Sequence, residues 1–135
     1  MNSATNQSFS HHLNALKSGI RKFENAFQGV SRMILEGGIE KVVVNGKTTY
    51  DFSIFRTGQK HIIGMYEEIN SFVSFVKDAA EGGSSKEMAF VLVGEPGNGK
   101  TFLVEYLSAL YRNFIAREEN RKYTFRFKHL DRLPP

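Results

Sequence analysis

Residues 94–101 carry a pattern of residue types that dictates a specific chemistry. They are Gly94, Glu95, Pro96, Gly97, Asn98, Gly99, Lys100 and Thr101, the G-x-x-x-x-G-K-T pattern of a phosphate-binding loop. The glycines allow positive φ angles, so that successive backbone N–H groups can converge on an anion. Lys100 would reach the β- and γ-phosphates, and the Thr101 hydroxyl would bind a Mg²⁺ ion that bridges them. The pattern therefore predicts a nucleoside triphosphate with Mg²⁺ as the ligand.

The flanking sequence is expected to place this loop between a strand and a helix. Residues 88–93 are apolar and partly β-branched, as in a strand that is buried on both faces. Residues 101–115 have apolar side chains at the spacing of one helical face. These are Leu103, Leu107, Leu110, Tyr111 and Phe114. The start of this helix would add unpaired N–H groups and the positive end of its dipole. The alternative, a Gly/Pro-rich turn that carries Lys and Thr by coincidence, is disfavoured by this context.

The composition suits one globular domain of a reducing compartment. The chain has 135 residues, of which 41% are hydrophobic and 24% charged, and it contains no cysteine. Disulfides, thiolate metal sites and cysteine nucleophiles are therefore excluded. Residues 1–10 lack the apolar core of a secretory signal, and no run of 18 apolar residues is present. We expect a cytoplasmic protein with no membrane partner.

The net charge of +4 arises entirely after residue 111. Residues 1–111 hold 11 basic and 11 acidic side chains, whereas residues 112–135 hold seven basic and three acidic ones. The favoured interpretation is a solvated helix end followed by an exposed strand face, because basic residues suit a helix C-terminus. A nucleic-acid surface is the alternative. We expect no nucleic-acid partner.

An amphipathic helix is predicted in the first segment of the chain, residues 1–38. From residue 10 onward, apolar side chains recur in steps of three and four. They are Leu13, Leu16, Ile20, Phe23, Phe27, Val30 and Ile34. Ser8 or Ser10 is the expected N-cap, and Gly37 the expected stop. We favour packing of this face onto the rest of the chain over a coiled-coil dimer.

A hairpin and a second helix are predicted before the loop, and another strand after it. Residues 41–50 place Asn45-Gly46 between two β-forming runs, which is the strongest short hairpin signal. Residues 65–80 have one apolar helical face, and a Gly/Ser-rich connection follows them. Residues 123–128 alternate apolar with polar residues, which is typical of a strand with one solvated face.

Four sequence segments and the hairpin occur in a characteristic order. The segments are F-x-G-V-x-R-M-I at 27–34, H-I-I-G-M-Y-E-E-I at 61–69, F-V-K-D-A-A-E-G at 75–82 and L-V-G-E-P-G-N-G-K-T at 92–101. This order resembles the N-terminal AAA+ module of the PrkA serine protein kinase family, over most of the chain. The resemblance implies an α/β fold of the P-loop NTPase class. Residues 39–135 would comprise the hairpin and the N-terminal part of the AAA+ domain, with an incomplete parallel sheet and flanking helices, preceded by the N-terminal helix.

The resemblance also suggests which residues lie beside the adenine. Ile62, Ile63 and Gly64 match the segment that has this position in AAA+ proteins, although Ile62 and Ile63 by themselves suit a core equally well. Glu95 departs from the Gly-Pro-Pro-Gly-like loops common in such proteins, and Thr101 stands where Ser is often seen. Neither departure removes a backbone donor, the lysine or the hydroxyl that would bind Mg²⁺.

Parts that a complete ATPase or kinase of this family needs are not recognised in the sequence. No apolar strand that ends in Asp or Asp-Glu follows Thr101, and Asp131 comes after an alternating segment, which is wrong for a buried central strand. We therefore assign no catalytic residue. Because the strand before the loop and the next strand in sequence are not neighbours in an AAA+ sheet, we expect the chain to be the N-terminal portion of a longer protein.

Three functional hypotheses follow. The favoured one is Mg-ATP binding by a module whose full-length form phosphorylates Ser/Thr residues or remodels a protein partner. The second is another P-loop enzyme, such as a helicase loader, a chaperone-like ATPase or a small-molecule kinase. The third is a non-enzymatic regulatory fragment that self-associates through its N-terminal helix.

Overall fold

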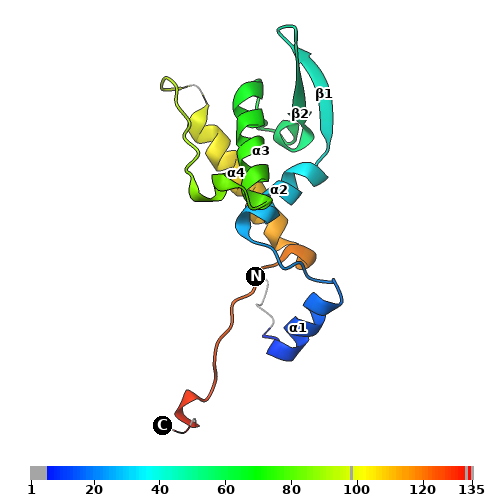
Figure 1. Ribbon diagram of the computed structural model, residues 1–135, viewed down its shortest axis with the longest axis vertical. Helices are drawn as coiled ribbons and strands as arrows, with labels where there is room; N and C mark the ends of the chain where they lie inside the picture. The colour runs from blue at the N-terminus through cyan, green and yellow to red at the C-terminus, as the bar shows by residue number, and fades with distance from the viewer. Residues whose placement is uncertain (1–5, 98, 133, 135) are drawn as a thin grey trace. The chain divides into compact units, whose positions relative to one another are not determined.

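A computed structural model describes residues 6–97, 99–132 and 134 of the chain (Figure 1). The main elements are α1 (Phe9–Lys17), α2 (Ala26–Glu36), β1 (Ile39–Val44), β2 (Lys47–Phe52), α3 (Tyr66–Ala80) and α4 (Lys100–Ala116). Short 3₁₀ turns are η1 (Ser53–Arg56), η2 (Ser84–Glu87), η3 (Glu118–Asn120) and η4 (Leu130–Arg132). No helix of the described part is long and apolar enough to cross a membrane.

The chain forms two compact units. The larger unit comprises residues 24–114, and the smaller comprises residues 1–23 together with 115–135. This division differs from the predicted boundary at residues 38 and 39. The reason is α2, which packs against α3 within the larger unit.

The N-terminal helix that we predicted over residues 1–38 is broken into α1 and α2. Ser8, one of the two predicted N-caps, caps α1, and its hydroxyl accepts a backbone hydrogen bond of 3.2 Å. Gly19, just after α1, has a φ angle of +75°, a conformation that ends helices. A capping box then starts α2: Asn25 and Gln28 exchange hydrogen bonds of 2.9 and 3.0 Å between side chain and backbone. The continuous helix was therefore a wrong prediction, whereas the stop at Gly37 is confirmed.

The predicted hairpin is confirmed. Strands β1 and β2 pair antiparallel, from Ile39 opposite Phe52 to Val44 opposite Lys47. Asn45 and Gly46 form the turn with φ angles of +50° and +75°, the pair of positive angles that a two-residue type I′ turn requires. The Asn70 side chain on α3 bonds to the backbone of Tyr50, so the hairpin is attached to that helix.

The core of the larger unit is built from α2, η1, α3 and α4. Its largest fully buried side chains are Ile34, Phe55, Ile62 and Ile69. The apolar face predicted for residues 65–80 is confirmed, since α3 buries Ile69, Val73, Val76 and Ala79. Helix α4 joins this core through Leu103 and Phe114, and the Arg32 guanidinium of α2 lies 4.7 Å from the centroid of the Phe114 ring.

Neither of the other two predicted strands is formed in the described residues. Residues 88–93 contain no assigned strand, although Phe90 packs 5.4 Å, between ring centroids, from both Phe72 and Phe75 of α3. Val91 and Val93 are exposed instead of buried on both faces. Residues 123–128 likewise contain no strand. A strand needs a partner for its backbone N–H and C=O groups, and the sheet seen here joins only β1 with β2. No parallel pairing of the kind predicted occurs among the described residues.

In the smaller unit, a buried arginine links α1 with the segment after α4. One Arg21 nitrogen lies 2.9 Å from His12 Nδ1, and another donates to the Tyr123 hydroxyl at 3.0 Å and to the Gln7 side chain. The guanidinium also stacks 4.0 Å from the centroid of the Tyr123 ring. These contacts fix Tyr123 and leave Phe125 and Phe127, further along the same segment, exposed.

Candidate functional site

Residues 94–97 are exposed, and Gly99 leads directly into α4, which includes Lys100 and Thr101. The chain turns at Pro96-Gly97, and Gly97 and Gly99 have φ angles of +87° and +79°, the left-handed region that glycine adopts without strain. Helix α4 begins at Lys100, and Leu103 N donates to Gly99 O at 2.9 Å. The backbone N–H groups just before Leu103 come too early in α4 to have an acceptor within the helix. They can therefore donate hydrogen bonds to an anion. Asn98 lies outside the described residues.

The Lys100 side chain folds back over this loop. Its Nζ atom donates to the carbonyl oxygens of Gly94 and Glu95, each at 2.6 Å. A lysine ammonium is a compact charge on a flexible stem, so it can exchange these carbonyls for other oxygens nearby. Thr101 follows in the first turn of α4 and is exposed. The loop therefore brings together one ammonium, one accessible hydroxyl and the start of a helix.

The segment predicted to lie beside the adenine passes close to the loop. Ile62 is 2% exposed and belongs to the core, whereas Ile63 is 83% exposed. Gly64 and Met65 have φ angles of +68° and +54°. The Met65 sulfur lies 3.3 Å from the position of a Cβ atom built on Gly99. The structure thus brings this segment next to the loop, with Ile62 turned inward and Ile63 accessible.

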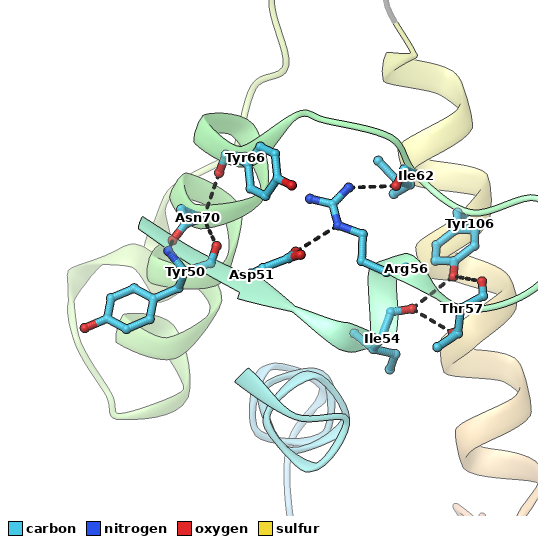
Figure 2. A network of polar contacts seen from close by, with 9 residues as sticks. All are labelled: Tyr50, Asp51, Ile54, Arg56, Thr57, Ile62, Tyr66, Asn70 and Tyr106. Carbon is cyan, nitrogen blue, oxygen red and sulfur yellow. Dashed lines mark hydrogen bonds and ion pairs between the residues drawn. The ribbon is translucent and has the colours of Figure 1, made fainter. Parts of the chain in front are cut away.

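A polar network, which the sequence analysis missed, supports that segment (Figure 2). Arg56 donates through Nε to Asp51 Oδ1 at 2.8 Å and through Nη1 to the Ile62 carbonyl oxygen at 2.6 Å. Its guanidinium carbon lies 4.6 Å from the centroid of the Tyr66 ring, at the start of α3. No local pattern marks Arg56, because its partners are five to ten residues away on different elements.

Tyr106 of α4 reaches the same region. Its hydroxyl lies 2.9 Å from the Ile54 carbonyl oxygen and 2.6 Å from that of Thr57, so its single proton is shared between two acceptors (Figure 2). The Tyr106 ring also packs against Phe55. Tyr106 follows the buried Leu103 by three residues, a spacing that could have indicated an inward-facing hydroxyl.

The described residues offer few protein ligands for a metal ion. No group of three or more His, Asp or Glu side chains that could hold a metal occurs among them. Asp131 lies in η4, within the smaller unit, and does not follow a strand. At the start of α4, the exposed Thr101 hydroxyl is a candidate ligand for a hard cation such as Mg²⁺.

Residues 94–97 of the loop are exposed, and Gly99 and Lys100 are partly buried. Two depressions occur elsewhere: one of about 670 Å³ lies between the start of α2 and the end of α3, and one of about 550 Å³ lies in the smaller unit near Arg21. Neither is lined by a residue of 94–101.

Comparisons with protein-family models, with curated proteins and with solved structures find no match to this chain. A functional assignment therefore depends on the loop's own chemistry and geometry.

Proposed function

We propose that this chain binds Mg-ATP through residues 94–101, as the N-terminal AAA+ part of a cytoplasmic, PrkA-like serine protein kinase or ATPase. The observation that carries the proposal is the loop itself: Gly97 and Gly99 are left-handed, and α4 starts immediately after them with Lys100 held on the loop. The expected parallel sheet and the coupling to a protein substrate belong to this proposal.

Each loop residue has a defined role in the proposed complex. Lys100 would move from the carbonyls of Gly94 and Glu95 to the β- and γ-phosphate oxygens, which are stronger acceptors because they are charged. The amides at the start of α4 would bind the phosphates, aided by the helix dipole. When bound, Mg²⁺ neutralises phosphate charge, and Thr101 would hold it through its hydroxyl. Ile63 and Gly64 would lie beside the base.

The interrupted N-terminal helix bears on the alternative of a self-associating fragment. A coiled-coil seam needs a helical stripe that continues over several heptads. Here α1 has nine residues and α2 has eleven, with Gly19 in the left-handed region between them. This geometry disfavours association through a continuous N-terminal seam.

Calorimetric titration with Mg-ATP tests the proposal. Lys100→Ala removes a charged hydrogen bond worth about 1.5 to 3 kcal/mol, so the affinity should fall by about 10- to 100-fold. Lys77→Ala is the matched control, because Lys77 is an exposed lysine of α3 in the same unit, outside the loop. Equal affinity of the parent and Lys100→Ala proteins would remove the assignment.

A further inference from the structure

We propose that Arg56 and Tyr106 are positioning residues that hold residues 62–65 against the phosphate loop. They would thereby set the affinity for the base and ribose of a nucleotide, while affinity for its phosphates depends on the loop alone. This inference depends on the proposed nucleotide site, but its structural part can be tested without a ligand.

Residues 62–65 have a backbone conformation that needs outside support. Gly64 and Met65 are successive left-handed residues, and the left-handed region is unfavourable for a side chain such as methionine. Met65 is also the N-cap of α3 and makes no side-chain capping hydrogen bond. The first helical hydrogen bond, from Ile69 N to Met65 O at 3.0 Å, holds the segment at its C-terminal end, and the left-handed turn before it has no side-chain cap.

Arg56 supplies support at both ends of this segment. It binds the Ile62 carbonyl oxygen before the turn, and its guanidinium stacks on the Tyr66 ring after the turn (Figure 2). Phe55 O also accepts a hydrogen bond of 3.0 Å from Ile62 N. The ion pair with Asp51 at the end of β2 orients the guanidinium. A planar fork with several donors suits this arrangement, and lysine cannot reproduce it.

Tyr106 connects this support to the phosphate loop. Its hydroxyl binds the carbonyl oxygens at Ile54 and Thr57, which flank Arg56 on η1. Tyr106 lies on α4 six residues after Lys100, a rise of about 9 Å along the helix. The contacts close a ring: α4 holds η1 through Tyr106, Arg56 of η1 holds Ile62, and Met65 returns to Gly99 at the start of α4.

One nitrogen of Arg56 indicates that its role is geometric. Nη2 is buried and has no hydrogen-bond partner among the described residues. A buried donor without a partner lowers stability. The bonds of its other nitrogens to Asp51 and Ile62, together with the Tyr66 ring, hold the guanidinium in this position despite that cost.

The binding test compares ATP with tripolyphosphate, which has no base or ribose, each in the presence of Mg²⁺. The variants are Arg56→Lys, which keeps the charge, and Tyr106→Phe, which keeps the ring. Tyr50→Phe is the control, since Tyr50 is half exposed and contributes its backbone to the contacts in Figure 2. Both variants should weaken ATP binding about five- to tenfold and change tripolyphosphate binding less than twofold. Equal losses for the two ligands, or no loss, would overturn the proposal.

Amide hydrogen exchange on the ligand-free protein separates this inference from the proposed function. In Arg56→Lys and Tyr106→Phe, the amide of Ile62, which donates to Phe55 O at 3.0 Å, should exchange at least about tenfold faster, while the amides of α2 keep their rates. Unchanged exchange at Ile62 would show that the two side chains do not hold the segment. If exchange accelerates but the parent protein binds neither ATP nor tripolyphosphate, the nucleotide site is wrong and the positioning network remains.

Discussion

Met65 and Gly99 lie so close that a side chain at position 99 would contact the methionine. The Met65 sulfur is 3.3 Å from the position that a Cβ atom on Gly99 would occupy, which is tighter than ordinary van der Waals contact. Gly97, two residues earlier, also has a positive φ angle, but a Cβ atom there would have open space around it. Alanine at Gly97 therefore measures the cost of the left-handed backbone alone, whereas alanine at Gly99 measures that cost together with the cost of the Met65 contact.

Gly99→Ala should lower the free energy of unfolding more than Gly97→Ala. Each substitution places alanine in the left-handed region at a cost of about 1 to 2 kcal/mol. Gly99→Ala should add about 1 kcal/mol from crowding against Met65. Urea denaturation measures both, and Met65→Ala in each background should abolish the difference. Equal destabilisation by the two substitutions would mean that residues 62–65 do not lie against the loop.

The hydroxyl of Thr101 should matter only when Mg²⁺ is present. Thr101→Val removes the proposed metal ligand and keeps the shape of the side chain, whereas Thr101→Ser keeps the hydroxyl. Because Thr101 is exposed, neither change should affect the fold. We expect Thr101→Val to weaken Mg-ATP binding about tenfold and to leave binding of ATP in a chelator unchanged. Calorimetry with and without Mg²⁺ checks this, and an equal loss in both buffers would argue against a metal ligand at this position.

Glu24 should stabilise the larger unit through Arg32. The two side chains form a bidentate pair at 2.7 and 3.1 Å, and hydrogen bonding to Glu24 raises the pKa of Arg32 above its ordinary value. Glu24 is 9% exposed, whereas Glu36, which also binds Arg32, is 53% exposed. Glu24→Gln should cost about 1.5 to 3 kcal/mol in urea denaturation, and the control Glu36→Gln at most about 0.5 kcal/mol. An equal decrease in the free energy of unfolding for the two variants would show that burial of the Glu24–Arg32 pair does not add to stability.

Ser85 should control the titration of Asp78 at the end of α3. Hydrogen bonds from the Ser85 hydroxyl and from its backbone N–H, at 3.0 Å, lower the pKa of Asp78. A carboxyl whose pKa is lower in the folded state stabilises the fold above its unfolded pKa of about 3.9, and this contribution is lost as the pH falls through the folded pKa. Ser85→Ala should raise the Asp78 pKa towards its ordinary value in an NMR titration. Ser84→Ala should leave it unchanged, and the same pKa in both variants would contradict the assignment.

Local signals in the sequence were sufficient for several elements. The Asn45-Gly46 pair predicted the hairpin because a type I′ turn needs positive φ at both residues, which few other pairs tolerate. The apolar periodicity of α3 predicted its buried face, and Ser8 predicted the start of α1. Each of these features depends on residues within a few positions of one another.

The break between α1 and α2 shows where periodicity alone fails. Apolar side chains at Ile20 and Phe23 continue the steps of three and four, yet both residues are exposed and lie outside any helix. Asn25 and Gln28 have the spacing of a capping box, a signal that competes with the periodic pattern and decides the local structure. A search for caps inside the predicted helix would have found the break.

Long-range partners account for the remaining differences. Residues 88–93 have the composition of a buried strand, but pairing requires a neighbouring strand that composition cannot supply. Arg56 meets Ile62 across six residues, and Tyr106 meets Ile54 across 52 residues, only after the chain folds. The loop motif could be read from the sequence, whereas the side chains that hold its surroundings could not.

The hairpin provides a site for labelling the larger unit with a fluorophore. Because the chain contains no cysteine, Thr48→Cys would introduce a unique thiol for attachment of a fluorophore. Thr48 is exposed on β2, and Asn70 fastens that strand to α3 through the Tyr50 backbone. A dye placed there would lie outside residues 94–101 and would report the tumbling of the larger unit, so unfolding or self-association could be followed optically.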